Sequence, residues 1–498
     1  MLDASRADLV AAVAGAGTMG RGIAQVLAQG GARTFLFDAQ PGAAAKARDS
    51  IAQALGKLAE KGRMSAADAD AVVRRIEIAP SLEAFAPAHV VVEAIVEDLQ
   101  EKRKLFAALE GIVPESTILA SNTSSLSVTA MAAGCKRPAR VAGYHFFNPV
   151  PVLKIVEVVD GVRTEAWVTE ALAALARRFG HTPVRCKDTP GFIVNHAGRA
   201  FVPEALRVLS EGVADFATID RILVDAAGFR IGPFGLMDLV GLDVNHAVMR
   251  SMYHQYFEEP KYKPSFLVEA RVAAGLLGRK TGRGWYEYGA DGSQKKIEEP
   301  AAPKARPEAI WIVPELKALF STLALPAERL PGRHTVNFVA PLGKDVTTAA
   351  LEQGLDPERT VGVDPLFGFG KRRTLMASPA TKPEVREAAH GLLASDGVPV
   401  SVIRDSPGFV AQRVVAHIVN VACDMMQMRI CSPEDLDRAV MLGLGYPKGP
   451  LGMGDALGAA KVLEVLEAMQ ATYDEPRYRP SPWLRRRAQL DLSLLIPD

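Results

Sequence analysis

The chain lacks the features that mark several broad classes of protein. Its charges nearly cancel, with 58 Lys and Arg against 57 Asp and Glu in 498 residues, so bulk charge does not predict binding to nucleic acid or to a membrane surface. No apolar run approaches the roughly 18 residues that a membrane-spanning helix needs. The first residues, MLDASRADLV, lack the basic segment and apolar core of a signal peptide. We therefore expect neither membrane insertion nor export.

Cysteine is also scarce. The four cysteines are Cys135, Cys186, Cys423 and Cys431. Because none of them forms a CxxC pair or has the spacing of metal ligands, we predict no metal site. Reduced thiols of this kind favour a cytoplasmic location. A chain of 498 residues that is 48% hydrophobic has enough material for roughly two to four domains with cores of their own.

A glycine-rich turn lies between two strand-like segments near the start of the chain. The apolar run Leu9–Val13 leads directly into GAGTMG, and a helical stretch then continues to about Gln29. A second apolar run, Thr34–Phe37, ends in Asp38. Strand, turn, helix, strand and acid in this order are typical of a dinucleotide-binding unit. The turn alone is weak evidence, because glycine-rich turns also occur for purely structural reasons, but the flanking elements make it specific.

Each glycine of this turn has a separate task in such a unit. Gly15 permits the tight turn, Gly17 lets the backbone approach a pyrophosphate, and Gly20 lets the helix pack close to the strand. Asp38 can accept hydrogen bonds from ribose hydroxyls and would repel a 2′-phosphate, so the sequence favours NAD over NADP. The predicted cofactor-binding residues of the turn are Gly15, Gly17, Thr18, Met19, Gly20 and Asp38.

Polar residues follow three further strand-like runs. The runs are Val90–Val92, Ile118–Leu119 and Val141–Tyr144. The polar residues after them are Glu93 and Glu97, then Ser121–Ser125, then His145. Any one of these groups could simply cap a helix. Together they would meet in one crevice, because ligands of open parallel sheets bind at the carboxyl ends of the strands.

Seven segments carry a family resemblance at this point. They are GAGTMGRGIA, VVEAIVED, ASNTSSLS, HFFNPVPVLKIVEVV, DTPGFIVN, GPFGLMDLVGLD and GRKTGRGWYEY. Over about residues 8–288 their order and spacing resemble the L-3-hydroxyacyl-CoA dehydrogenase family, and the total length resembles its long bacterial form, which acts on 3-hydroxybutyryl-CoA or 3-hydroxyadipyl-CoA. The resemblance implies an α/β Rossmann-type NAD-binding domain, an all-α domain after it and an acyl-CoA substrate.

The resemblance also assigns roles to single residues. It implies His145 as the catalytic base with Glu157 as its partner, and Ser124 and Asn195 as contacts of the substrate or of that histidine. The residues implied on the nicotinamide side are Glu97, Lys102 and Asn122, and Asn148 is implied to shape the catalytic loop. One position departs from the family pattern, because His196 stands where an arginine is expected.

The predicted pair suits the oxidation of a secondary alcohol. A hydride leaves toward the nicotinamide, and a base must take the hydroxyl proton, for which an imidazole is well matched near neutral pH. Glu157 would fix the tautomer of His145 and stabilise the imidazolium. The alternative interpretation is a core histidine and a strand carboxylate that faces solvent.

The second half of the chain repeats part of the first. DTPGFIVN from Asp188 returns as DSPGFVAQ from Asp405, and GPFGLMDLVGLD from Gly232 returns as GPLGMGDALGAA from Gly449, both at an offset of 217. In this register His145 corresponds to Gly362, Glu157 to Thr374 and Asn195 to Gln412. Since no second glycine turn precedes them, we predict a non-catalytic copy.

These observations predict four segments. They are an NAD-binding Rossmann domain (1–187), a helical domain (188–290), a linker with a degenerate connecting domain (291–400) and a second helical domain (401–498). Family members with one helical domain pair through it, so the second copy is expected to cover that face within the chain. The sequence leaves open whether the full chain also forms a homodimer.

Two other functions compete with oxidation of an acyl-CoA. One is the oxidation of a free hydroxy acid, as in the related gulonate dehydrogenase and lambda-crystallin group, although the form HFFNPVPV favours the thioester. The other is a protein that binds NAD without catalysis, which the intact His145–Glu157 pair argues against.

Overall fold

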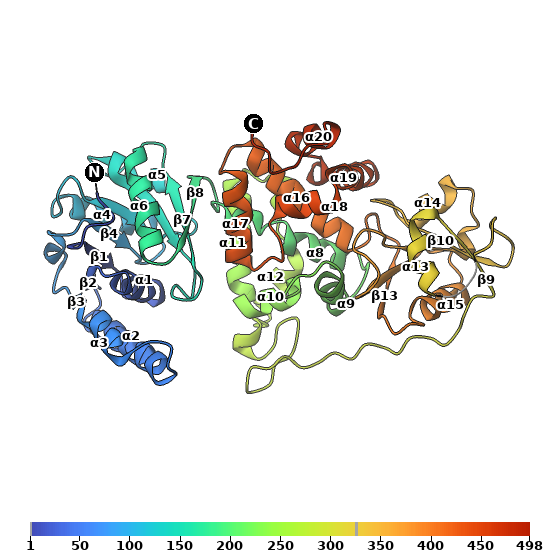
Figure 1. Cartoon of the computed structure of the whole chain (residues 1–498), viewed down its shortest axis with the longest axis horizontal. Helices are drawn as coiled ribbons and strands as arrows, with labels where there is room; N and C mark the ends of the chain where they lie inside the picture. Colours follow the sequence, from blue (N-terminus) through green and yellow to red (C-terminus); the bar gives the residue numbers. More distant parts are fainter. Residues whose placement is uncertain (1, 324–326) are drawn as a thin grey trace. The chain divides into compact units, whose positions relative to one another are not determined.

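A computed structural model describes residues 2–323 and 327–498 of the chain (Figure 1). It divides into two compact units. Unit 1 contains the residues up to His196 together with Arg429–Leu444, and unit 2 contains Ala197–Met428 and Gly445–Asp498. A short segment of the second half of the chain therefore belongs to the unit that the first half builds. None of the helices in the described residues is long and apolar enough to cross a membrane.

Unit 1 is built on an eight-stranded sheet. Its strands are β1 (Val10–Ala14), β2 (Arg33–Phe37), β3 (Ile76–Ile78), β4 (Val90–Glu93), β5 (Ile118–Ser121), β6 (Val141–Phe146), β7 (Ile155–Asp160) and β8 (Thr182–Lys187). Their order is β3-β2-β1-β4-β5-β6-β7-β8. All neighbours run parallel except β6 and β7, which pair antiparallel. The Rossmann-type sheet predicted from the sequence is thus present, and β1 and β4 lie in its interior.

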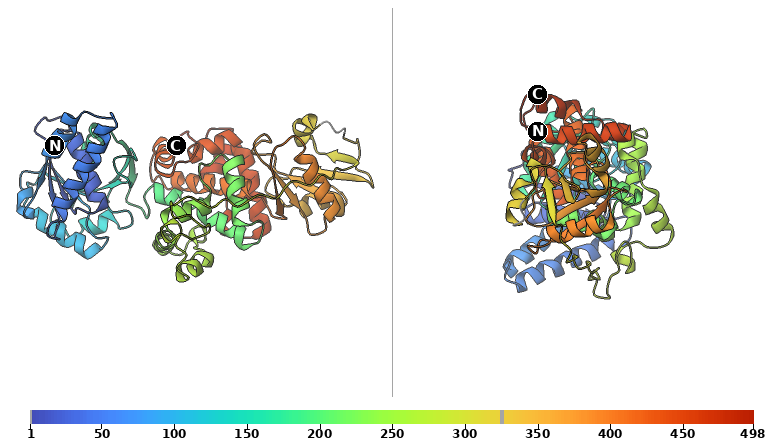
Figure 2. Two further views of the ribbon diagram at one scale, coloured as in Figure 1. Left: turned by 90° about the horizontal axis from the view of Figure 1, so that it is seen from below. Right: turned by 90° about the vertical axis from the view of Figure 1, so that its right-hand side faces the viewer.

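The helices of unit 1 flank this sheet, except that the pair formed by residues 43–60 and 66–74 extends away from it (Figures 1 and 2). They are α1 (Thr18–Gln29), α2 (Ala43–Glu60), α3 (Ala66–Arg74), η1 (Leu82–Phe85), α4 (Leu99–Glu110), α5 (Val128–Ala132), η2 (Pro138–Arg140), α6 (Ala166–Arg178), α7 (Val194–Ala197) and α17 (Pro433–Leu444). The apolar stripe of α1, with Ile23 and Leu27 fully buried, packs on β1. The Asp98 side chain caps α4 by accepting from two backbone N–H groups of its first turn.

The helices of unit 2 come from both halves of the chain. The first half supplies α8 (Phe201–Ser210), α9 (Phe216–Arg221), η3 (Ile222–Ala226), α10 (Pro233–Val240), α11 (Leu242–Gln255), η4 (Pro260–Tyr262), α12 (Phe266–Ala273) and η5 (Arg279–Thr281). The second half supplies α16 (Ala411–Gln427), α18 (Pro450–Leu457), α19 (Ala459–Tyr473), η8 (Pro476–Tyr478) and α20 (Pro482–Gln489). The two sets meet where α16, buried along almost all of its length, packs against α8.

Unit 2 also carries a five-stranded sheet in the region predicted to be a degenerate connecting segment. The strands are β9 (Ala309–Ile312), β10 (Thr335–Val339), β11 (Thr360–Val363), β12 (Arg373–Ala377) and β13 (Val400–Arg404), in the order β13-β12-β11-β10-β9. The helices around it are η6 (Pro314–Leu316), α13 (Lys317–Thr322), α14 (Val346–Glu352), η7 (Pro357–Arg359) and α15 (Pro383–Leu393). Before β9, residues 295–307 have no regular secondary structure and are mostly exposed.

This second sheet is a shortened copy of the first. The register that aligns Asp188 with Asp405 also places β5, β6, β7 and β8 on β10, β11, β12 and β13, with closely matching ends. The single antiparallel pair is also in the same place, between β11 and β12. Within the described residues, no strands of this sheet correspond to β1, β2 and β3. The copy has therefore lost the strands that flank the glycine-rich turn, which explains in structural terms why it has no cofactor loop.

Candidate functional site

The antiparallel pairing of β6 and β7 places His145 directly opposite Glu157. Opposite residues in such a pair project to the same face of the sheet. The His145 Nδ1 and Glu157 Oε2 atoms are 2.6 Å apart, and the two residues are 5% and 0% exposed. The alternative interpretation of Glu157 as a carboxylate that faces solvent is therefore wrong.

The second oxygen of Glu157 is held by the backbone. Its Oε1 atom accepts hydrogen bonds from the amides of Ile193 and Val194, at 2.9 and 2.8 Å. These amides follow a tight turn in the DTPGFIVN segment, in which Gly191 and Phe192 both have positive φ. The carboxylate is thus fixed by three hydrogen bonds. Since a carboxylate only accepts, Nδ1 of His145 donates and Nε2 remains as the basic nitrogen of the ring.

Apolar rings surround the imidazole. The Phe147 ring lies 4.4 Å from the His145 ring and the Phe192 ring lies 5.8 Å from it, measured between centroids. Phe192 is buried, whereas Phe147 is half-buried. Surroundings of low polarity strengthen the interaction between His145 and Glu157. The arrangement can therefore move a proton at Nε2 while the charge that develops on the ring is stabilised from the opposite side.

The structure brings Ser124 and Asn195 together. The Asn195 Nδ2 atom donates to the Ser124 carbonyl at 3.4 Å. Ser124 is exposed and Asn195 is half-buried, so both can be reached by a ligand. Both residues were predicted to contact the substrate or the catalytic histidine, and Asn195 directly follows Val194, whose amide holds Glu157.

Glu97 organises the loop that carries Ser124. Its Oε1 atom accepts from the Thr123 hydroxyl at 2.6 Å and from the backbone amides of Ser124 and Ser125 at 3.1 and 3.2 Å. Burial alone would raise the pKa of Glu97, but hydrogen bonds from the Thr123 and Ser125 hydroxyls and the charge of Lys102 hold it below its usual value. The Glu97 carboxylate therefore fixes the shape of the loop.

Lys102, predicted on the nicotinamide side, is almost fully buried, with a side chain that is 1% exposed. Its ammonium group lies 2.6 Å from Glu93 Oε1 and 3.2 Å from Glu97 Oε2. Glu93 was noted in the sequence only as a strand-end acid, yet it also accepts from the Ser121 hydroxyl at 2.6 Å. The position of Glu93 at the end of the apolar run VVVE indicates a buried carboxylate, which needs partners such as Lys102 and Ser121.

Two asparagines have different positions near the end of β6, the strand that carries His145. Asn122 Oδ1 accepts from the Phe146 amide at 2.9 Å, which ties the loop after β5 to the end of β6. Asn148, predicted to shape the catalytic loop, is exposed and precedes a cis bond to Pro149. Asp188 was not singled out, although it accepts from the Ser127 hydroxyl and from two amides at the start of α5.

The glycine-rich turn has the geometry that a dinucleotide requires. Gly15 has φ +104°, and a Cβ there would lie 2.3 Å from the Ala94 carbonyl oxygen, while a Cβ on Gly20 would meet the Gly15 carbonyl. A Cβ on Gly17 would meet nothing within 4 Å, so the backbone can be approached closely there. Asp38 accepts from the Ala16 amide at 2.7 Å.

A cavity of about 780 Å³ opens beside this turn and is lined by Gly15, Gly17, Asp38 and the segment after β4. Thr18 is exposed and Met19 half-buried at the start of α1. The free N–H groups of this helix start can hold a pyrophosphate, and Asp38 can hold a ribose. The residues present therefore fit NAD.

The second copy retains the scaffold of this site without its chemistry. Gly362 and Thr374, the counterparts of His145 and Glu157 in the register of the duplication, stand on β11 and β12, but Gly362 pairs with Met376 and not with Thr374. Gln412 Nε2 donates to the Pro341 carbonyl at 3.2 Å, as Asn195 does to Ser124 in the same register. Gln412 also donates to Asp364, a buried carboxyl whose pKa is raised to about 6 by burial. A Cβ on Gly362 would lie 2.7 Å from Val346 and 3.3 Å from Phe409, so the space at the counterpart of His145 is filled by apolar side chains.

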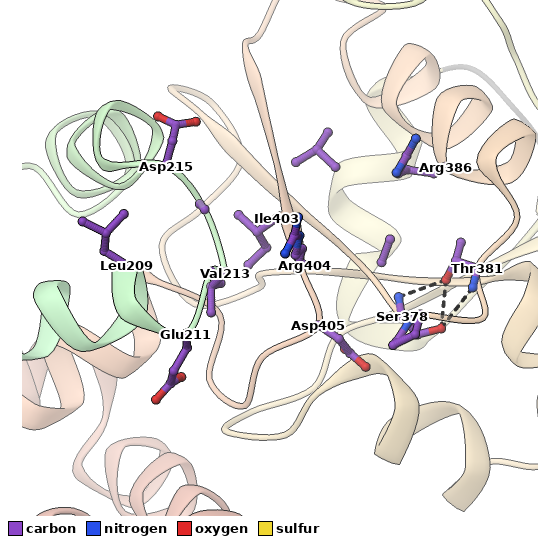
Figure 3. A pocket seen from close by; sticks show the side chains of 15 residues that line it. Leu209, Glu211, Val213, Asp215, Ser378, Thr381, Arg386, Ile403, Arg404 and Asp405 are labelled. Carbon is purple, nitrogen blue, oxygen red and sulfur yellow. Dashed lines mark hydrogen bonds between the residues drawn. The ribbon is translucent and has the colours of Figure 1, made fainter.

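Unit 2 contains another cavity, of about 810 Å³, between the ends of β12 and β13 and the segment after α8 (Figure 3). Arg386 and Arg404 line it and make no side-chain ion pair with any residue that the structure describes. Asp215 caps α9, and Asp405 accepts from the start of α14. No histidine lines this cavity, so it holds no counterpart of the His145–Glu157 pair.

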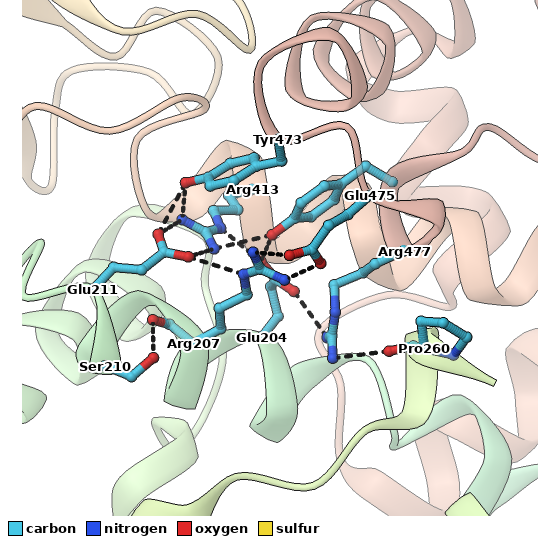
Figure 4. A network of polar contacts seen from close by, with 10 residues as sticks. Glu204, Arg207, Ser210, Glu211, Pro260, Arg413, Tyr473, Glu475 and Arg477 are labelled. Carbon is cyan, nitrogen blue, oxygen red and sulfur yellow. Dashed lines mark hydrogen bonds and ion pairs between the residues drawn. The ribbon is translucent and has the colours of Figure 1, made fainter. Parts of the chain in front are cut away.

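A charge network inside unit 2 connects the two sets of helices (Figure 4). Arg413 on α16 and Glu204 on α8 are both 0% exposed and lie 2.6 Å apart. Arg413 also pairs with Glu211, and Arg477 lies 3.1 Å from Glu204. Although burial opposes ionisation of Glu204, the charges of Arg413 and Arg477 keep its pKa below the usual value. This network belongs to unit 2 and joins its helices, whereas the dyad belongs to unit 1.

Comparison with known proteins agrees with this geometry. The sequence matches the 3-hydroxyacyl-CoA dehydrogenase NAD binding domain over residues 10–189 and the C-terminal domain of the same enzymes twice, over residues 191–288 and 408–492. It is 38% identical to 3-hydroxyadipyl-CoA dehydrogenase of Escherichia coli over 96% of this chain and 97% of that protein. A probable 3-hydroxybutyryl-CoA dehydrogenase of Bacillus subtilis is 41% identical over 55% of this chain and 96% of its own length. The crystal structure of 3-hydroxybutyryl-CoA dehydrogenase from Escherichia coli superposes with a TM-score of 0.87 at 37% identity, covering 97% of this chain and 99% of that one. The chain therefore belongs to the 3-hydroxyacyl-CoA dehydrogenase family of NAD-dependent oxidoreductases.

Proposed function

We propose that His145 is the general base in the oxidation of an L-3-hydroxyacyl-CoA, and that the preferred acyl chain is short and ends in a second carboxylate. The observation that carries the first part is the buried contact of 2.6 Å between His145 Nδ1 and Glu157 Oε2, which leaves Nε2 as the proton acceptor. NAD, when bound, accepts the hydride from the carbinol carbon.

The chain's own residues then have separate tasks. His145 Nε2 takes the proton of the 3-hydroxyl, while Glu157 stabilises the imidazolium and keeps the ring in one orientation. Ser124 and Asn195, which lie together at the loop after β5, are placed to hold the hydroxyl and the developing carbonyl. We propose the domain limits 1–187, 188–290, 291–400 and 401–498 for this division of tasks between an NAD-binding part and the helical parts.

The preference for a dicarboxylic chain is supported by the full-length similarity. The relative named 3-hydroxyadipyl-CoA dehydrogenase corresponds to this chain over 96% of its residues, which includes both copies of the repeat. The Bacillus relative named for 3-hydroxybutyryl-CoA corresponds to 55% of this chain. The crystal structure named for 3-hydroxybutyryl-CoA spans both copies as well, so chain length and the second carboxylate need a direct comparison.

A matched series of substrates tests this proposal. The rate of NADH formation would be measured with the 3-hydroxy thioesters of butyryl-, hexanoyl-, decanoyl- and adipyl-CoA. The hexanoyl and adipyl substrates have equal carbon number and differ in the second carboxylate. We expect kcat/KM to be at least tenfold higher for the adipyl compound. An equal or higher value for hexanoyl-CoA would contradict the dicarboxylate preference, and faster oxidation of free 3-hydroxybutyrate than of its thioester would contradict the acyl-CoA substrate.

The second helical copy is proposed to replace, within the chain, the pairing that single-copy relatives make between subunits. The packing of α16 on α8 inside unit 2 supports this view. A chain that ends after residue 299 should then dimerise or aggregate, and a well-behaved monomer in sedimentation analysis would contradict it. The four free thiols favour a cytoplasmic protein.

A further inference from the structure

Unit 1 contains a segment of the duplicated half, Arg429–Leu444. The Lys187 amide at the end of β8 donates to the Ile430 carbonyl at 2.9 Å, and the Arg185 amide donates to Asp435 at 3.2 Å. Helix α17, which begins at Pro433, packs against β7 and β8. The strand that carries Glu157 is therefore covered by residues from the second copy.

The contact is repeated in the other copy. In unit 2 the Arg404 amide at the end of β13 donates to the Val213 carbonyl at 2.9 Å. In the register of the duplication, Arg404 is the counterpart of Lys187, and Val213 is the counterpart of Ile430. Each sheet thus receives the same backbone hydrogen bond from the helical segment of the other copy. Because the same hydrogen bond occurs in both copies, we regard this contact as a property of the duplication and not as an accidental contact.

One glycine connects α17 to the catalytic carboxylate. A Cβ on Gly443 would lie 3.0 Å from both γ-carbons of Val194, which is closer than side chains normally pack. The amide of Val194 donates to Glu157 Oε1 at 2.8 Å, and Glu157 holds His145. In the non-catalytic copy the corresponding residues are Ala226 and Ala411. The glycine and the valine thus occur together in the unit that carries Glu157.

We propose that α17 of the duplicated half is a positioning element of the active site, and that Gly443 is the contact through which it acts. By seating Val194, Gly443 keeps the Val194 amide in line with Glu157 Oε1, and the carboxylate keeps His145 in place. The second copy thereby sustains catalysis in the first although it has no dyad. This inference rests on the proposed roles of His145 and Glu157.

Substitution of Gly443 in the full-length protein tests the proposal. In Gly443→Ala the new methyl group must displace Val194 by a few tenths of an ångström. Misplacement of a catalytic group by about 1 Å can cost roughly a hundredfold in rate, so we expect kcat to fall about tenfold. KM for the acyl-CoA and the affinity for NADH should stay within twofold. Since alanine favours a helix over glycine, the melting temperature should not fall. If the contact served only to hold the fold together, the melting temperature would fall and kcat would stay the same.

Rescue and a matched control complete the test. Val194→Ala removes the two γ-carbons that the new methyl meets, so the double variant should recover at least half of the lost kcat. Met441→Ala changes an exposed residue of the same helix, 44% accessible, and should behave as the unmodified protein. Unchanged kcat in Gly443→Ala, or no recovery in the double variant, would overturn the proposal.

A parallel variant separates this inference from the proposed function. Glu157→Ala should lower kcat strongly, and adding Gly443→Ala to it should cost little more, because the two changes act on the same carboxylate. If Glu157→Ala keeps full activity, the proposed role of the dyad fails. If Glu157→Ala is inactive but Gly443→Ala has no effect, the dyad stands and the positioning role of α17 alone is wrong.

Discussion

Replacing Glu157 by glutamine keeps the size of the side chain and removes its charge. The Ile193 and Val194 amides both donate to Oε1, at 2.9 and 2.8 Å, so the oxygen of the new amide must occupy that position. Its NH₂ group then faces His145 Nδ1, which lies 2.6 Å from the present oxygen. An NH₂ group only donates, so Nδ1 would have to accept, and the ring proton would move to Nε2. The nitrogen that should take the substrate proton is then already occupied.

The size of the effect follows from two contributions. Two unit charges about 4 Å apart attract each other by about 4 kcal/mol at an effective dielectric of 20. Loss of this stabilisation of the imidazolium corresponds to about a thousandfold in rate. The wrong tautomer adds to the loss, and comparable carboxylate-to-amide changes beside a catalytic histidine cost about 10⁴ in kcat. We expect Glu157→Gln to lower kcat by 10³ to 10⁴, roughly.

Steady-state formation of NADH measures kcat, and fluorescence titration measures the affinity for NADH, which should change less than twofold. Glu358→Gln, at an exposed position 54% accessible in unit 2, is the control for a loss of one charge. Glu157→Ala should lower kcat no more than Glu157→Gln does, because alanine has no NH₂ group that would hold the His145 proton on Nε2. If Glu157→Gln keeps more than a tenth of the original kcat, Glu157 does not act on His145 in the way described.

Two further predictions concern stability. Arg413→Met leaves the buried Glu204 without its nearest cation, so the free energy of unfolding should drop by about 3–5 kcal/mol in urea titrations; a loss under about 1 kcal/mol would contradict the burial of the pair. Asp364 has its pKa raised from 3.8 to about 6 by burial, so the folded state binds a proton more tightly than the unfolded state. Stability from this group is complete below about pH 4 and is lost as the pH rises through 6, by about 3 kcal/mol. Asp364→Asn should therefore raise the melting temperature at pH 8 but not at pH 4, and equal shifts at both values would show that Asp364 titrates normally.

Local patterns in the sequence predicted the first sheet and the dyad, because both depend on short-range signals. The glycine turn, the strand ends and the segment from His145 to Glu157 are each short and continuous in the chain. The second sheet was described only as a degenerate connecting region, since its strands have lost the glycine turn that makes such a unit visible. Burial of Lys102 and Glu93 depends on side-chain packing across three elements, which periodicity does not encode.

The place of α17 could not be predicted for a related reason. Its sequence is the counterpart of α9 and η3 in the register of the duplication, and the repeat says which residues correspond but not which sheet they cover. An exchange of equivalent helices between the two copies costs little free energy, because only the loops that lead into the helices have to change direction. Once such an exchange is present, a truncation of the second half would remove a helix from the catalytic unit.

The register of the duplication also accounts for His196, the position at which an arginine was expected. Its counterpart in the second copy is Arg413, and the counterpart of Glu204 is Val421. A twofold pair of subunits would contain the arginine–glutamate pair twice, whereas this chain keeps one pair as Arg413–Glu204 and has changed both members of the other to His196 and Val421. Loss of only one member would bury an unpaired charge at a cost of several kcal/mol, so the two changes had to accompany each other. A fused chain can lose one of the two pairs, because its two copies mutate independently. A symmetric dimer cannot, because every substitution occurs in both of its subunits. His196 and Val421 therefore fit the independent change of two fused copies.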